Sequence, residues 1–357
     1  MLAFQVIHKK LEAVAKPIPK LRAGWALIRL RLAGICNTDL EILRGYHDFH
    51  GTPGHEFVGQ VAEVRRARPA IEAQWLGRRV TGEINIHCSA FGYRPVCAFC
   101  RRGLLTHCAR RRVLGIVGQD GTFAEYLTLP LENLHVVPDK ISDEQAVFVE
   151  PLAAACRILE QVAVRSFREA AVLGDGKLAQ LIARVLRTAL PRVVMYGKHS
   201  DKLALARGAG IETNRVRGEA SDLQGIKQKY RLLVEATGSA GGLALAQHMV
   251  EPRGTLVLKS TFHGAAAVAT WPIVVKEITV LGSRCGPFEK AMALLRSGAL
   301  DPRPLITRVF PLPEAREAIR FAEQRGVMKV LLAAPQSRDQ DGARSRIPRG
   351  GARVTSG

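Results

Sequence analysis

Residues 172–179 read VLGDGKLA, and this short stretch decides the fold of the chain. It begins in an apolar segment, residues 170–173, which is typical of a buried strand. After it, apolar residues repeat on one face of an expected amphipathic helix, at Leu178, Leu181, Ile182, Val185 and Leu186. The stretch therefore reads as strand, loop and helix.

The loop itself has the pattern G-x-G-x-x-A, which between a strand and a helix indicates dinucleotide binding. Gly174 permits the tight turn, Gly176 lets the pyrophosphate approach the backbone, and Ala179 allows the helix to pack closely. Lys177 and Leu178 open the helix, whose free N–H groups favour phosphate. The ordinary alternative is a strand-to-helix turn with no ligand.

The same rhythm continues along the second half of the chain. Apolar segments alternate with helical ones, and the strands are expected at residues 170–173, 192–196, 232–236, 255–258 and 278–281. This predicts a doubly wound parallel sheet. Beyond it we expect a helix at 289–300, a strand near 308–310, a helix at 313–323 and a strand at 329–332.

Residues 1–140 instead show short alternating segments between many glycines and prolines, which predicts a β-rich domain. Ile28, Leu30 and Leu32 alternate with Arg29 and Arg31, as in a half-buried strand.

The end of the second parallel strand bears on the choice of cofactor. An NAD site commonly places an acid there, against the ribose 2′-hydroxyl. Gly197 stands at that point, followed by Lys198, His199 and Ser200, which suit a 2′-phosphate better. We therefore expect NADP to be favoured over NAD. The alternative is that Lys198 and His199 are solvated and Asp201 binds the ribose.

The cysteines predict a second kind of site. Cys97, Cys100 and Cys108 form a local cluster, and Cys88 is available as a fourth ligand despite the eight residues between it and Cys97. Four thiolates around one ion make a closed, structural zinc site. The alternative is a set of reduced or disulfide-paired thiols.

Four further residues have side chains that bind metals but lie too far apart in sequence to declare a site: Cys36, His55, Glu56 and Glu150. Spacing alone leaves each with an ordinary role, such as a buried thiol, a core histidine or a carboxylate at a helix start.

Several motifs occur together in one order: GICNTDL at 34–40, GHEFVG at 54–59, the cysteine cluster, VEPLAAA at 149–155, VLGDGKLA, VEATGS at 234–239 and PLITRVFPL at 304–312. In these the chain resembles the zinc-dependent medium-chain alcohol dehydrogenases over residues 1 to about 334. It is most similar to the polyol and threonine dehydrogenase branch, which has Glu at the later ligand position.

The resemblance implies an α/β protein in two parts. A GroES-like β-rich catalytic domain would span 1–148 and be completed by 286–334, and a Rossmann domain would span 149–285. Residues 335–357 have almost no apolar content and are expected to form a disordered basic tail.

The resemblance also assigns roles. Catalytic zinc would be held by Cys36, His55, Glu56 and Glu150, with Thr38 starting a proton relay and Asp39 orienting the histidine. His47 could extend the relay. The cofactor-binding residues would be Gly174, Gly176, Lys177, Leu178, Gly197, Lys198, His199 and Thr237.

The expected activity is hydride transfer between NAD(P) and a secondary alcohol or polyol, or its carbonyl product. The partners expected are a small-molecule substrate and further copies of the chain, as a dimer or tetramer. With no apolar leader and no membrane-length apolar run, a cytoplasmic location is expected.

A net charge of +20 motivates a rival, a nucleic-acid or other polyanion-binding protein on the same fold, with arginines at 101, 102 and 110–112. A second rival is a zinc-independent quinone or enone reductase, which the four candidate zinc ligands disfavour. The remaining arginines are scattered, so nucleic acid is not the expected partner.

Overall fold

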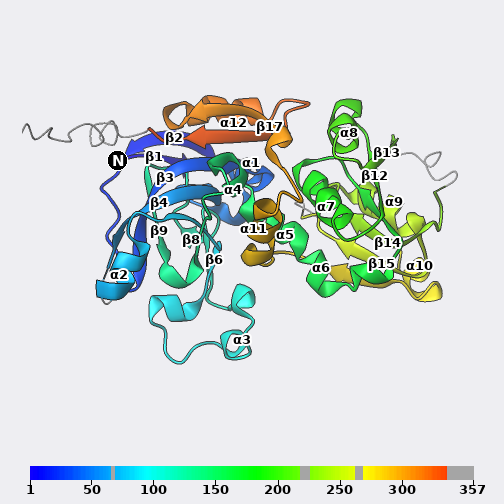
Figure 1. The fold of residues 1–357 in the computed structure, drawn as a ribbon, viewed down its shortest axis with the longest axis horizontal. Helices are drawn as coiled ribbons and strands as arrows, with labels where there is room; N and C mark the ends of the chain where they lie inside the picture. The colour runs from blue at the N-terminus through cyan, green and yellow to red at the C-terminus, as the bar shows by residue number, and fades with distance from the viewer. Residues whose placement is uncertain (66–68, 218–225, 262–267, 336–357) are drawn as a thin grey trace, which may run out of the picture.

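The computed structural model describes residues 1–65, 69–217, 226–261 and 268–335. It has two lobes, a β-rich lobe and a lobe built on a parallel sheet (Figure 1). The predicted tail lies outside the described residues apart from Pro335. Among the described residues, none of the helices has the length and hydropathy of a membrane span.

The β-rich lobe is organised around one seven-stranded sheet. Its strands are β3 (Trp25–Ile35), β4 (Glu56–Val64), β5 (Arg79–Gly82), β9 (Tyr126–Pro130), β10 (Leu134–Val136), β17 (Ile306–Pro311) and β18 (Lys329–Ala333). They follow the order β10-β5-β4-β3-β18-β17, and β9 also pairs with β3. The end of the described chain therefore returns to the N-terminal lobe, because β18 runs antiparallel to β3.

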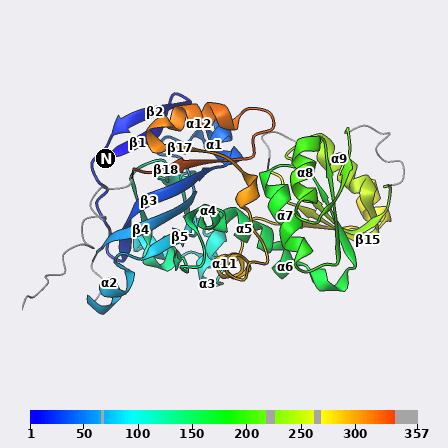
Figure 2. The same cartoon turned by 45° about the horizontal axis from the view of Figure 1, so that its top comes forward.

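Smaller elements complete this lobe. A hairpin joins β1 (Leu2–Ile7) to β2 (Lys10–Ala15), and a three-stranded sheet joins β6 (Asn85–Ile86), β7 (Arg112–Leu114) and β8 (Gly118–Gln119). Its helices are α1 (Asn37–Leu43), α2 (Pro69–Trp75), α3 (Ala98–Arg101), α4 (Asp143–Ala146) and α12 (Ala315–Ala322). Figure 1 shows the segment around α3 projecting away from the main sheet. Figure 2 shows α12 on the opposite side of the lobe, beside β17 and β18.

The second lobe has a six-stranded parallel sheet in the order β13-β12-β11-β14-β15-β16. The strands are β11 (Glu169–Leu173), β12 (Arg192–Gly197), β13 (Glu212–Arg215), β14 (Tyr230–Glu235), β15 (Val250–Leu258) and β16 (Thr279–Gly282). The strand order reverses between β11 and β14, so the crevice beyond their carboxyl ends is the expected ligand position.

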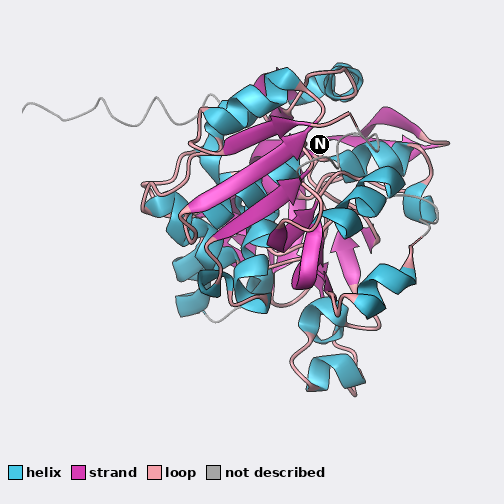
Figure 3. Cartoon of the chain, turned by 90° about the vertical axis from the view of Figure 1, so that its right-hand side faces the viewer, coloured by secondary structure: helices cyan, strands magenta, loops and turns pink. Residues whose placement is uncertain are grey.

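Helices cover this sheet on both sides (Figure 3). They include α7 (Lys177–Arg187), α8 (Ser200–Arg207), α9 (Ala240–Met249) and α10 (Thr270–Val275). Toward the β-rich lobe follow α5 (Val149–Cys156), α6 (Ile158–Gln161) and α11 (Phe288–Arg296), and α11 packs against α5. Alternate residues of β11 belong to different cores: Val172 packs with α7 residues, whereas Ala171 packs with Met249 of α9. The predicted doubly wound sheet is confirmed.

Most predicted elements are present, with differences that have local causes. The helix expected at 289–300 ends at Arg296, because Gly298 adopts a left-handed φ of +72°. The helix expected at 313–323 begins only at Ala315, after a 3₁₀ turn at Leu312–Glu314. The alternation predicted in β3 is confirmed for Ile28 and Leu30, which are buried, and for Arg31, which is exposed. The face predicted for Leu32 is wrong: it packs into the other core, because the register shifts between Leu30 and Leu32.

Candidate active site and zinc-ligand clusters

The first cluster forms where β3 leads into α1 and where β4 begins. Cys36 caps α1, and the Asp39 carboxylate accepts a hydrogen bond from the Cys36 backbone N–H at 2.8 Å. The other oxygen of Asp39 accepts from the backbone N–H of Gly54 at 3.1 Å. One fully buried carboxylate therefore fixes both loops that carry candidate ligands.

Three of the predicted catalytic zinc ligands come together here. The ligand atoms of Cys36, His55 and Glu56 all lie within 4.8 Å of one another. Asp39 Oδ1 lies 3.4 Å from His55 Nδ1, although the two are not aligned as a hydrogen bond. Burial lowers the pKa of His55, but the charges of Asp39 and Cys36 outweigh it and leave that pKa well above its usual value.

Glu150, the fourth predicted ligand, lies outside that 4.8 Å group. It is in the first turn of α5, which packs against β4. Burial raises the pKa of its carboxyl to about 7, while His55 and Glu56 act on it in opposite directions. Glu150 is thus close enough to feel the cluster electrostatically without being part of it.

Two lysines border the cluster, and sequence reasoning missed one of them. Lys329 of β18 donates to the Glu56 carboxylate, and both side chains are almost fully buried, at 2% and 1% exposure. Gly34 makes room for this carboxylate, because a Cβ there would overlap Glu56. The sequence feature that could have revealed Lys329 is a single lysine beside the apolar residues of KVLL, because a buried ammonium group needs a partner.

Lys177 was expected at the cofactor phosphates, and the structure directs it toward the β-rich lobe. Its Nζ lies 3.4 Å from the carbonyl oxygen of Ile35, and Lys329 Nζ lies 3.4 Å from the same oxygen. Burial and, to a smaller extent, the neighbouring charge of Lys329 lower the pKa of Lys177 to about 8. The glycine-rich loop of one lobe is thus tied to the residue next to Cys36 of the other.

The predicted relay residues are placed differently from each other. Thr38 Oγ1 lies 3.7 Å from Cys36 Sγ, so its hydroxyl borders the cluster. His47 is exposed, packs its ring on Tyr46 with centroids 4.1 Å apart, and has a left-handed φ of +59°. The structure therefore brings Thr38 to the cluster but not His47.

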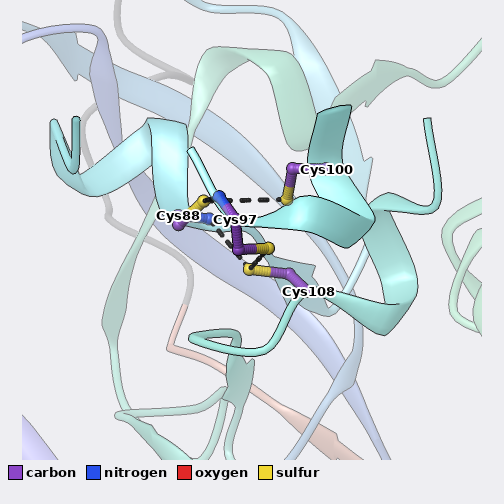
Figure 4. Close-up of side chains that lie close together, drawn as sticks. All are labelled: Cys88, Cys97, Cys100 and Cys108. Atoms are coloured by element: carbon purple, nitrogen blue, oxygen red, sulfur yellow. Dashed lines mark hydrogen bonds between the residues drawn. The ribbon is translucent and has the colours of Figure 1, made fainter. Parts of the chain in front are cut away.

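The second cluster contains Cys88, Cys97, Cys100 and Cys108, which converge in the segment around α3 (Figure 4). Cys88 Sγ lies 3.7 Å from Cys100 Sγ, and Cys97 Sγ lies 3.7 Å from Cys108 Sγ. These distances exclude disulfides. They match the edge of about 3.8 Å of a tetrahedron whose centre is about 2.3 Å from each sulfur, the usual zinc–thiolate distance.

The eight residues between Cys88 and Cys97 do not separate these two ligands. A 3₁₀ turn at Cys88–Phe91 leads the chain back, so that the Cys97 backbone N–H donates to Cys88 Sγ at 3.4 Å. Cys108 Sγ accepts from the backbone N–H groups of Cys88 and Arg110, at 3.3 and 3.4 Å. A hydrogen bond from the Cys100 backbone lowers the pKa of Cys97 to about 6, whereas burial raises the pKa of Cys100 to about 12.

Two aromatic rings in this segment, those of Phe91 and Tyr93, lie against arginine side chains. Arg112 lies over the Phe91 ring at 4.5 Å and Arg110 over the Tyr93 ring at 5.5 Å. Cation–π contacts of this kind occupy ring faces on which bases would have to stack.

The glycine-rich loop has the form that a pyrophosphate requires. Gly174 has a φ of +124°, and a Cβ there would lie 2.5 Å from the Ala236 carbonyl oxygen. A Cβ on Gly176 would meet no atom within 4 Å, so the backbone is open to a ligand at this point. Leu178 is half-buried and packs against the apolar core behind the loop.

A second loop, after β14, faces the same end of the sheet. Glu235 is buried and accepts hydrogen bonds from the backbone N–H of Thr237 at 2.7 Å and from its hydroxyl at 2.6 Å. Ser260 also donates to Glu235, at 3.1 Å. Thr237 is thus held by a buried carboxylate that sequence reasoning did not single out.

A parallel sheet with a glycine-rich loop at its switch point, and metal-binding side chains beside that loop, define a zinc-binding dehydrogenase. The model of the alcohol dehydrogenase GroES-like domain matches residues 22–139. Erythritol/L-threitol dehydrogenase from Mycolicibacterium smegmatis is 30% identical over 348 residues, covering 90% of this chain and 94% of that protein.

Solved structures agree. A zinc-binding dehydrogenase from Sinorhizobium meliloti bound to NADP superposes with a TM-score of 0.83 at 26% identity, over 93% of this chain and 98% of that one. An Escherichia coli alcohol dehydrogenase in complex with NADH gives a TM-score of 0.84 at 26% identity, over 93% and 99%.

The chain belongs to the zinc-dependent medium-chain alcohol dehydrogenase family, as its motifs predicted. It is an oxidoreductase of alcohols, in the same group as the polyol dehydrogenases that it resembles in sequence.

Proposed function

We propose that this chain oxidises a polyol or other secondary alcohol, or reduces the matching carbonyl, where its two lobes meet. The observation that carries the proposal is the contact between Lys177 and the Ile35 carbonyl oxygen. It holds the glycine-rich loop beside Cys36, so a dinucleotide on that loop and a metal on the cluster would share one substrate.

The donor set of the first cluster suits zinc: Cys36 and His55 would hold the ion, with Glu56 or Glu150 as the remaining protein ligand. Bound zinc and nicotinamide supply Lewis acidity and hydride acceptance, respectively. Thr38, at the edge of the cluster, would accept the substrate proton at its hydroxyl oxygen and release its own hydroxyl proton to solvent. Asp39 fixes the two ligand loops through its bonds to Cys36 and Gly54, and its carboxylate lies beside the His55 imidazole.

The thiolate cluster is proposed as a second, structural zinc site. Its sulfur positions and backbone N–H···S contacts support this role.

The dinucleotide proposed is NADP in preference to NAD. In support, Gly197 leaves no acidic side chain at the end of β12, and the exposed Lys198 and Ser200 follow it. A higher kcat/KM with NADPH than with NADH would support the preference, and a strong preference for NADH would contradict it.

We further propose the division of labour predicted from the sequence. Residues 1–148 with 286–334 would carry zinc and substrate, and residues 149–285 would carry the dinucleotide. The exposed apolar side chains of α10 and the edge position of β16, which among the described residues pairs only with β15, support a homo-oligomer formed through the second lobe.

The decisive experiment is a dehydrogenase screen over tetritols, pentitols, secondary alcohols and aldehydes, with both cofactors. We expect polyol oxidation that a chelator abolishes and that zinc restores. A Cys36→Ser variant should be inactive, whereas Cys285→Ser, which changes a thiol outside both clusters, should keep activity. Chelator-insensitive enone reduction, or salt-sensitive RNA binding without any alcohol or carbonyl turnover, would contradict the proposal.

A further inference from the structure

Asp175 lies between the two glycines of the loop and turns toward the neighbouring strand. Its Oδ2 accepts hydrogen bonds from the backbone N–H groups of Lys198 and His199, both at 2.8 Å. The His199 ring contacts the same carboxylate, with Nδ1 2.9 Å from Oδ2 and 3.2 Å from Oδ1. Asp175 is 8% exposed, so this carboxylate is part of the wall of the site.

Asp175 also explains why the acid expected after β12 is missing. A Cβ on Gly197 would lie 2.5 Å from Asp175 Cβ and 2.7 Å from its Oδ2. A side chain at 197 and the carboxylate at 175 therefore exclude each other. The Asp175 carboxylate thus occupies the space that a side chain after the second strand would need.

This carboxylate disfavours a 2′-phosphate and favours a ribose hydroxyl. It already binds the N–H groups and the imidazole that would otherwise be offered to a 2′-phosphate, and its negative charge would repel that phosphate. Among the described residues, Asp175 Oδ1 contacts the His199 ring, with 3.2 Å between Oδ1 and Nδ1. Oδ1 can therefore still accept a hydrogen bond from a ribose hydroxyl.

We propose that Asp175 determines cofactor specificity: it binds the adenosine ribose as a hydroxyl acceptor and opposes the 2′-phosphate. This inference rests on the proposed dinucleotide site. It limits the NADP preference that Gly197, Lys198 and Ser200 favour, and makes Asp175 the residue through which that preference is adjusted.

The test uses two nucleotides that differ only in the 2′-phosphate, 5′-AMP and 2′,5′-ADP, titrated into the full-length protein by calorimetry. Asp175→Asn keeps the shape and one acceptor but removes the charge. We expect the ratio of Kd for 5′-AMP to Kd for 2′,5′-ADP to rise about tenfold or more in this variant. Asp175→Ser is the second variant, used if the first does not fold, and should shift the ratio in the same direction.

Asp201→Asn is the matched comparison, because it removes the same charge from the first turn of α8. We expect it to change the ratio by less than about twofold. An unchanged ratio in the folded Asp175 variant, or an equal shift in Asp201→Asn, would overturn the inference while leaving the dinucleotide site in place. If the wild-type protein bound neither nucleotide, the dinucleotide site would fall, and the inference with it.

Discussion

Lys329 and Glu56 form an ion pair with almost no exposure to solvent, next to the candidate zinc ligands. Removing two charges from water costs several kcal/mol each, and only mutual attraction and further hydrogen bonds offset that cost. Lys329 has such a bond, to the Ile35 carbonyl oxygen. We therefore expect the largest loss of stability when one of the two charges is removed and the other stays buried.

Replacing Lys329 by Met should reduce the free energy of unfolding of metal-free protein by about 3 to 5 kcal/mol, because Glu56 is left buried and unpaired. The double variant Lys329→Met, Glu56→Gln should recover part of the loss, since no buried charge then remains unpaired. Urea denaturation checks both. A Lys329→Met variant within about 0.5 kcal/mol of wild type would show that the pair is not effectively buried.

Replacing each of the two glycines of this loop by alanine should affect a different property: stability at Gly174 and dinucleotide binding at Gly176. Gly174→Ala should lower the melting temperature, because its Cβ would meet the Ala236 carbonyl oxygen and the residue has a φ of +124°. Gly176→Ala should melt like wild type, since nothing lies within 4 Å, yet bind dinucleotide at least about tenfold more weakly because the Cβ obstructs the pyrophosphate. Differential scanning fluorimetry and calorimetric titration separate the two effects; similar behaviour of both variants would contradict this assignment.

At the residue scale, sequence could reveal side chains that belong to a local pattern. The glycines of VLGDGKLA and the cysteines of the thiolate cluster have that property. Cys36, His55 and Glu56 needed the family resemblance, because β3 and β4 bring them together only after pairing. Lys329 arrives from the other end of the chain, so no local pattern indicates its partner.

At the scale of elements, the segment from Cys88 to Cys108 has little regular structure. It contains 3₁₀ turns at Cys88–Phe91 and Leu105–His107 and the four-residue α3. Short elements of this kind have few apolar contacts of their own, so a metal bound by four thiolates would contribute directly to their folding.

Mass spectrometry of the native protein should find two zinc ions per chain. A Cys97→Ser variant should retain one, because its closed thiolate site is lost while the first cluster is unchanged. Cys285→Ser, which alters a cysteine outside both clusters, should retain two. Two ions in the Cys97 variant, or one in the wild type, would contradict the assignment of zinc to this segment.

Elements with a strong apolar period were predictable, and polar ones were not. α7 follows its predicted apolar face, with Leu181, Ile182 and Val185 fully buried. β13 has the sequence ETNR, without an apolar residue, and joins the edge of the sheet by pairing with β12, so its sequence gives no apolar strand signal.

For the whole molecule, one surface of the second lobe is unusually apolar. α10 exposes Trp271, Val274 and Val275 by 64%, 73% and 73%, and the nearby β16 is an edge strand whose Val280 is 41% exposed. A second copy could cover the helix face and continue the sheet around a twofold axis, which would bury both features at once.

Light scattering should give the wild-type protein a mass of two or four times 38.9 kDa. A Val274→Asp, Val275→Asp variant should shift toward the single-chain mass, because two carboxylates would have to be buried. Val309→Asp is the control: Val309 is 45% exposed on β17, the edge strand of the other lobe, and its change should leave the mass as it is. A monomeric wild type would rule out the assembly.

The exposure of Trp271 has an optical consequence. The chain has three tryptophans: Trp25 is 3% exposed and Trp75 is half-buried within the β-rich lobe, so neither faces α10. Indole fluorescence shifts to shorter wavelength when the ring leaves water, and Trp271 is the ring whose surroundings assembly would change. The unlabelled protein therefore carries its own reporter of self-association, and dilution should move its emission toward the red.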